Sequence, residues 1–203
     1  MTAQAPHQLK SLSLQLPSDV ALRVTPEQFA ALAAANRELR FERSRTGELI
    51  VNPPTGGESG KRNLSISTQL GLWFEANDTL GEAFDSSTGF KLPNGANRSP
   101  EAAWVSKERW EALTPEQREG FVPLCPDFVV ELRSRTDNLK VLRDKMEEYR
   151  SNGAQLGWLI DPKTKRVKVY RQGQAVEVLE NPSMLSGETI LPGFTLNLKR
   201  VLN

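Results

Sequence analysis

The chain has 203 residues, of which 38% are apolar and 25% charged, and a formal net charge of +1, which suits one soluble domain. The single histidine, His7, and single cysteine, Cys125, argue against a Ser-His-Asp or Cys-His nucleophile, a Cys/His zinc site and an internal disulfide. A metal would have to bind carboxylate and backbone oxygens, which suits Mg²⁺ or Mn²⁺. The near-zero net charge means that a polyanion would need a local basic patch.

The chain contains no apolar run long enough to span a membrane, and its first 15 residues lack the apolar core of a secretory signal. A single cysteine also fits a reducing compartment, so we expect a cytoplasmic protein. Residues 1–18 are polar and unpatterned, which predicts a flexible arm. Residues 19–203 are then expected to form a single domain.

The N-terminal half alternates between helical and strand patterns. Thr25 and Pro26 mark a helix start, because threonine caps well and proline suits the first helical position. Residues 39–43 and 48–52 read as the two strands of a hairpin. The spacing of apolar residues predicts a second helix over about 58–77. Short strands are expected to follow over residues 81–84, 89–92 and 101–105.

The most unusual stretch is residues 126–133, where β-forming side chains alternate between two faces. Glu131 lies in the middle of this predicted strand. A carboxylate there is costly to bury unless a metal, a cation or hydrogen bonds satisfy it. We therefore expect a functional role for Glu131, with a solvated position on an edge strand as the alternative.

A charged helix follows this strand. Asp137 is its predicted N-cap, and Asn152 with Gly153 signals its end. Helical spacing sets Lys145 on or beside the buried stripe, although a lysine with its charged end in solvent is the plainer interpretation. The wholly apolar segment 157–160 predicts a central strand buried on both faces. The C-terminal remainder of the chain is expected to form a few short β-strands.

Two predicted strands carry carboxylates, Glu101 at the start of one and Glu131 inside the other. If the strands are neighbours, these carboxylates could approach closely, which usually means a bound cation because otherwise one of them takes up a proton. Lys145 could then orient or deprotonate a water, or stabilise charge on a phosphate. Asp127 reads equally well as a strand-start residue or as a functional one.

Taken in order, these features resemble the Uma-type family of putative restriction endonucleases, which belongs to the PD-(D/E)XK nuclease superfamily. The resemblance spans about 25–198. It implies an α/β (α+β) fold with a restriction-endonuclease-like central mixed β-sheet flanked by helices, and extra β-hairpins at the N- and C-terminal sides. It also implies Mg²⁺-dependent hydrolysis of DNA phosphodiester bonds, with Mn²⁺ as a substitute. The motifs that carry it are Ser99-Pro100-Glu101, residues 126–134, residues 145–149, Asn152-Gly153 and residues 157–162.

The resemblance assigns roles by position. Glu101 matches the first metal-binding acid, which the family more often has as aspartate, and Glu131 matches the acid of the E-x-K signature. The lysine position of that signature holds Arg133, which stays protonated and cannot readily act as a base. The candidate lysine is therefore Lys145 on the following helix. Asp127 is either a second acid of the catalytic metal site or a support for the strand.

A further metal-binding carboxylate is expected from the early helix, where Glu58 is our choice. Arg133, Arg135 and Lys61 or Arg62 are candidates for contacts with the DNA backbone, which would be sensitive to salt. Arg133 could also pair with a carboxylate instead of a phosphate. Because one active site per subunit cuts one strand, double-strand cleavage would favour a homodimer.

Two other interpretations stay open from the sequence. The first is a catalytically inactive member of the same fold that binds DNA or a protein, and both Arg133 and the near-neutral net charge leave room for it. The second is a structural module in which Glu131 forms a buried ion pair with Arg133 or Lys145.

Overall fold

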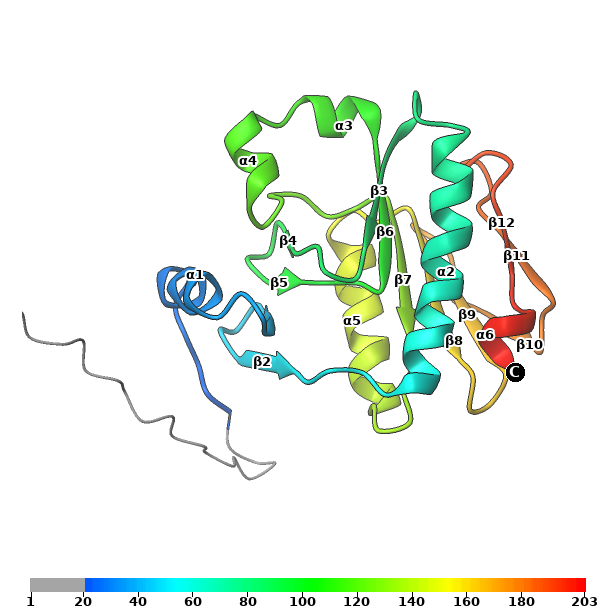
Figure 1. Ribbon diagram of the computed structural model, residues 1–203, viewed down its shortest axis with the longest axis horizontal. Coiled ribbons are helices and arrows are strands. Elements are labelled where there is room, and N and C mark those ends of the chain that lie inside the picture. Colours follow the sequence, from blue (N-terminus) through cyan, green and yellow to red (C-terminus); the bar gives the residue numbers. More distant parts are fainter. Residues whose placement is uncertain (1–20) are drawn as a thin grey trace, which may run out of the picture.

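The computed structural model describes residues 21–203 (Figure 1). The predicted arm, residues 1–18, lies outside the described residues. The helices are α1 (Pro26–Ala35), α2 (Gly57–Glu75), α3 (Lys107–Glu111), α4 (Pro115–Glu119), α5 (Leu139–Ser151) and α6 (Lys199–Leu202). The strands are β1 (Arg40–Arg43), β2 (Leu49–Asn52), β3 (Gly81–Asp85), β4 (Phe90–Lys91), β5 (Asn97–Arg98), β6 (Ala102–Ser106), β7 (Phe128–Leu132), β8 (Leu156–Asp161), β9 (Arg166–Arg171), β10 (Glu177–Glu180), β11 (Met184–Ser186) and β12 (Thr195–Asn197).

The central sheet has six strands in the order β10-β9-β8-β7-β6-β3. Strands β7 and β8 run parallel, and every other neighbouring pair in this sheet is antiparallel. Helices α2 and α5 lie on opposite sides of it (Figure 1). The predicted mixed sheet flanked by helices is therefore confirmed, and so is the central position of the strand over 157–160.

Strand β7 is buried along its whole length, and its side chains alternate between two cores, as the sequence pattern predicts. Phe128 and Val130 pack in one core with Ile66 of α2. Val129 packs in the other core with Tyr149 of α5. The side chains of β7 that share the face of Val129 therefore point toward α5.

The predicted hairpins are also present. Strands β1 and β2 pair antiparallel in a four-stranded sheet of order β2-β1-β5-β4, beside the central sheet. Gly47 lies in their connection with a φ of +89°, which other residues adopt only with strain. On the C-terminal side, β9 pairs antiparallel with β10, and β11 with β12. Among the described helices, no segment is long and apolar enough to cross a membrane.

The predicted N-cap of α5 is wrong by one residue. Asn138, and not Asp137, caps the helix, because its side chain accepts a hydrogen bond from the Lys140 backbone N–H at 2.9 Å. Asp137 instead accepts one from the Ser134 N–H at 2.7 Å and so closes the preceding turn. Asparagine and aspartate cap helices about equally well, so adjacent candidates cannot be separated by residue type.

Candidate active site

A cleft of about 550 Å³ opens where the end of β7 meets β1 and the first turns of α2. Among the polar side chains that line it, five from five different segments carry the argument. They are Glu42 of β1, Asn63 of α2, Glu101 just before β6, Glu131 of β7 and Lys145 of α5.

Glu131 and Lys145 meet at the base of this cleft. Lys145 Nζ lies 2.8 Å from Glu131 Oε1, and the Tyr149 hydroxyl donates to the same oxygen at 3.1 Å. Lys145 and Tyr149 are four residues apart on α5, so both side chains leave the same face of the helix. Glu131 is only 3% exposed, so its charge depends on these partners.

Glu42, like Asn63, is a member of the cleft that sequence reasoning missed. Its Oε1 lies 2.7 Å from Lys145 Nζ and accepts a hydrogen bond from the Ser99 N–H at 3.0 Å. Its Oε2 lies 3.2 Å from the Arg98 guanidinium. The signal was present, because Glu42 is a carboxylate inside a predicted strand, as Glu131 is. Charged neighbours on both sides, Arg40 and Arg43 among them, make Glu42 less conspicuous than Glu131, which stands between Val130 and Leu132.

Glu101 lies beside β7, because its backbone N–H donates to the Val130 carbonyl at 2.9 Å. The two acids predicted to be neighbours, Glu101 and Glu131, therefore line one cleft. Asn63 donates a side-chain hydrogen bond to the Glu101 carboxylate. The other end of that amide, Asn63 Oδ1, is buried and accepts no hydrogen bond from any described residue. An oxygen left in this way is open to a cation or a water.

The surroundings shift the pKa values of these groups. Burial raises the pKa of Glu131 to about 7, with the attraction of Lys145 opposing the shift and the charge of Glu42 adding to it. Burial also raises the pKa of Glu101. For Glu42, burial favours the neutral form, but Lys145 and Arg98 outweigh it and lower the pKa. Burial works against the charge of Lys145, yet Glu131 and Glu42 raise its pKa, so it is an ammonium.

The oxygen atoms around the cleft fit a divalent cation. Among residues 21–203 there is no group of three or more His, Cys, Asp or Glu side chains with the geometry of a metal site. Mg²⁺ needs fewer protein ligands than such a group, because it is often held by one or two carboxylates with water and substrate phosphate as its other ligands. The carboxylates of Glu101 and Glu131, the open Asn63 Oδ1 and the Leu132 segment offer oxygen ligands of the kind that Mg²⁺ prefers.

Asp127 lies away from the cleft lining. Its carboxylate accepts hydrogen bonds from the Ser106 N–H, the Arg109 guanidinium and the Gln155 amide, each at 2.8 Å. It is 1% exposed, so these three donors account for its burial. Of the two roles that the sequence left open for Asp127, this geometry favours support of the strand.

The cations predicted to contact DNA have three different surroundings. Arg133 pairs with Asp161 at 2.8 Å and is mostly covered, so it has a carboxylate as its partner. Arg135 is exposed and lines the cleft. Lys61 and Arg62 lie on the first turns of α2, at 2.9 and 3.4 Å from Glu58.

Glu58, the predicted third metal ligand, lies on the rim of the cleft and is exposed. Its carboxylate faces Lys61 and Arg62, so metal binding would require it to leave these two ion pairs. Exposed pairs of this kind contribute little to stability. The metal role of Glu58 stays a prediction.

Comparisons with known proteins agree with this fold. The model of the Uma2 family, described as a putative restriction endonuclease, matches residues 26–199. Among solved structures, a putative nuclease of DUF820 from Anabaena variabilis ATCC 29413 aligns with a TM-score of 0.72 at 20% identity. That alignment covers 88% of this chain and 97% of the Anabaena chain, and it shows a shared fold. A comparison with curated protein sequences found no match.

Proposed function

The chain belongs to the Uma2 family of putative restriction endonucleases, and we propose from this premise that it is a metal-dependent nuclease that hydrolyses DNA phosphodiester bonds. The observation that carries the proposal is a pair of acids, the half-buried Glu101 and the buried Glu131, that line one cleft with the Lys145 ammonium. Hydrolysis of a phosphodiester needs positive charge beside the reacting phosphate and an oriented water, and these groups can provide both.

In this proposal, Glu101, Glu131 and the Leu132 carbonyl hold Mg²⁺ or Mn²⁺, and Asn63 Oδ1 offers a further oxygen. The bound ion would supply Lewis-acid chemistry, lowering the pKa of a coordinated water and neutralising a phosphate oxygen. Burial keeps Glu131 partly protonated near neutral pH, because its pKa is about 7. Positive charge placed beside it favours the carboxylate form.

Lys145 supplies the second positive charge. Because its pKa is raised, it enters the reaction as an ammonium, which can orient the attacking water or stabilise the added charge of the five-coordinate phosphate. An ammonium has no lone pair, so a general-base role would require it to lose its proton first. All three of its N–H groups have acceptors within reach, namely Glu42, Glu131 and the Ser99 carbonyl at 3.3 Å. Contact with substrate therefore exchanges one of these acceptors for a substrate oxygen.

The charge around the cleft supports a path for the DNA backbone. A groove of about 840 Å³ between α2 and α6 is lined by Lys61, Lys199 and Arg200 and, among residues 21–203, by no acidic residue. A groove of about 1110 Å³ between β1, β2 and α5 is lined by several acids, including Glu48 and Asp144. We infer that phosphates follow the α2 and α6 side. Arg135 and Arg62 are the predicted contacts nearer the cleft.

Plasmid nicking tests the proposal directly. The wild-type protein should nick supercoiled DNA with Mg²⁺ or Mn²⁺ and lose this activity in chelator. Glu131→Ala and Glu101→Gln should each reduce the rate by roughly a hundredfold or more, as expected when a group that stabilises the transition state is removed. Glu177→Gln is the matched control and should cleave normally, because it changes an exposed acid of β10 that pairs with Arg171 of β9. Equal cleavage by wild type and Glu131→Ala would overturn the nuclease assignment.

A second candidate function is a non-catalytic DNA- or protein-binding module. The observation that favours it is the closed set of acceptors around Lys145, together with Arg133 at the lysine position of the signature. Calorimetric titration with Mn²⁺ separates the two functions. Binding that disappears in Glu131→Gln favours the nuclease, and an absence of binding in the wild type favours the module. The predicted homodimer stays a prediction, which light scattering with and without DNA would check.

A further inference from the structure

We propose that Glu42 is a positioning residue for Lys145, holding the ammonium in the cleft independently of Glu131. The proposal rests on the proposed function, because it assigns Lys145 its place in that site. It goes beyond the two acids and the lysine by giving a role to a carboxylate on a different sheet. Glu42 belongs to β1, whereas Lys145 belongs to α5.

The oxygens of Glu42 are already engaged. Oε1 takes the Lys145 ammonium at 2.7 Å and the Ser99 N–H at 3.0 Å, and Oε2 takes the Arg98 guanidinium at 3.2 Å. The side chain is 5% exposed. A carboxylate with three donors in a buried site is held in one orientation. Glu42 is thus better suited to hold Lys145 than to bind a metal, unlike Glu131, whose Oε2 has no partner among the described residues.

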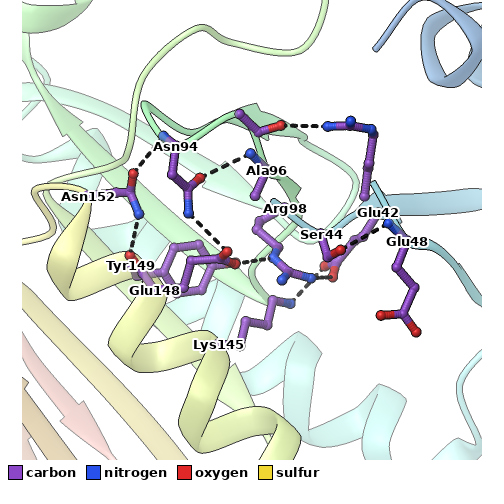
Figure 2. A network of polar contacts seen from close by, with 12 residues as sticks. Glu42, Ser44, Glu48, Asn94, Ala96, Arg98, Lys145, Glu148, Tyr149 and Asn152 are labelled. Atoms are coloured by element: carbon purple, nitrogen blue, oxygen red, sulfur yellow. Dashed lines mark hydrogen bonds and ion pairs between the residues drawn. The ribbon is translucent and has the colours of Figure 1, made fainter. Parts of the chain in front are cut away.

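A wider network fixes Glu42 relative to the helix that carries Lys145 (Figure 2). Arg98 of β5 lies between two carboxylates, Glu42 and Glu148, and pairs with Glu148 at 2.5 Å. Glu148 is on α5, three residues beyond Lys145, and also accepts a hydrogen bond from the Asn94 amide at 3.0 Å. Strand β1, the β4–β5 hairpin and helix α5 are therefore joined through charged hydrogen bonds.

This arrangement matters because Lys145 is shared between two acids with different tasks. Glu131 faces the cleft interior and is the acid that would change partners when a cation or substrate enters. Arg98 and the Ser99 N–H, the other two partners of Glu42, are not among the proposed metal ligands, so we expect Glu42 to stay in place in that event. Lys145 then retains its short ion pair with Glu42, which holds the ammonium near its place in the cleft.

Glu42→Gln is the decisive variant, because it removes the charge but keeps the size of the side chain. Glu48→Gln is its matched control, an exposed residue near the same hairpin whose carboxylate accepts no hydrogen bond from the described residues (Figure 2). Two readouts are used: the kinetic constants kcat and KM for DNA cleavage, and the ¹H–¹⁵N signal of the Lys145 ammonium. We expect kcat to fall roughly tenfold to a hundredfold with KM unchanged. The ammonium signal, visible because three acceptors slow its proton exchange, should be lost in Glu42→Gln and kept in Glu48→Gln.

The two readouts separate this proposal from the proposed function. If the wild type cleaves no DNA but the ammonium signal still depends on Glu42, the positioning role stands and the nuclease function fails. If Glu42→Gln keeps both the wild-type kcat and the signal, the positioning role is overturned. Should Glu42→Gln not fold, Arg98→Met tests the same network with Glu42 intact. It is expected to weaken the signal and lower kcat severalfold, and an unchanged signal and kcat would count against the proposal.

Discussion

Lys145 Nζ lies 2.8 Å from Glu131 Oε1, although the lysine comes from helix α5 and the glutamate from strand β7. In the E-x-K signature the lysine would follow the glutamate by two residues on the same strand. Here that position is held by Arg133, which pairs with Asp161 at 2.8 Å. The positive charge beside the buried acid is thus retained, but it reaches the acid from the helix packed over the sheet.

Removing the ammonium should destabilise the fold. Lys145→Met leaves Glu42 and Glu131 buried without their shared cation, so we expect the free energy of unfolding at pH 8 to fall by about 3–5 kcal/mol. Urea unfolding monitored by tryptophan fluorescence measures this loss. Lys140→Met on the same helix removes an exposed pair with Asp144 and should cost less than about 1 kcal/mol. Similar losses in the two variants would mean that the buried pair contributes no more than a surface one.

Stability should depend on pH through Glu131. Its pKa is about 7 in the folded protein against 4.5 as the ordinary value, so the folded state binds the proton more tightly. The stability that this group contributes is present below pH 4.5 and is lost as the pH rises through about 7, by an amount of order 3 kcal/mol. The glutamine of Glu131→Gln cannot ionise. In chelator, the unfolding free energy of this variant minus that of the wild type should therefore increase between pH 5 and pH 8. Parallel pH profiles for the two proteins would contradict the raised pKa.

How far the sequence predicts the site depends on how local each contact is. Strand alternation set Glu131 on the α5 face of β7, and helical spacing set Lys145 on the buried stripe of α5, so both elements could be assigned from nearby residues. The sheet also followed from local patterns. Glu42 could not be paired with Lys145 in this way, because their contact depends on how the N-terminal hairpin packs against α5.

Buried partners were equally hard to predict for two other residues. Asp127 and Arg133 lie in a motif that suggests function, but their environments are formed by side chains that are distant in the sequence. Asp127 is satisfied by Arg109 and Gln155, and Arg133 by Asp161. Residue type alone does not distinguish an arginine that faces a phosphate from one that faces a carboxylate, since both are bound through the same planar group.

Arg133 and Arg135 should therefore respond oppositely to substitution. Arg133→Met leaves Asp161 buried without its cation, so the free energy of unfolding should fall by about 3 kcal/mol while DNA affinity of the folded protein is unchanged. Arg135→Met should leave stability within about 0.5 kcal/mol of wild type and weaken DNA binding, because Arg135 is exposed in the cleft. Urea unfolding and fluorescence anisotropy with a labelled duplex measure both properties. Weaker DNA binding by folded Arg133→Met would instead assign this arginine to the backbone contacts.

The two grooves beside the cleft should differ in their response to salt. Each phosphate contact that is lost lowers the slope of log affinity against log salt concentration by about one. Replacing Lys199 and Arg200 with alanine should therefore reduce the slope by about two and weaken binding most at low salt, because both line the groove that lacks acids. Arg45→Ala changes a cation of the acid-lined groove and should leave the slope as it is. A slope that changes with Arg45 and not with Lys199 and Arg200 would place the DNA backbone on the β1–β2 side, where the acids Glu48 and Asp144 would have to be neutralised.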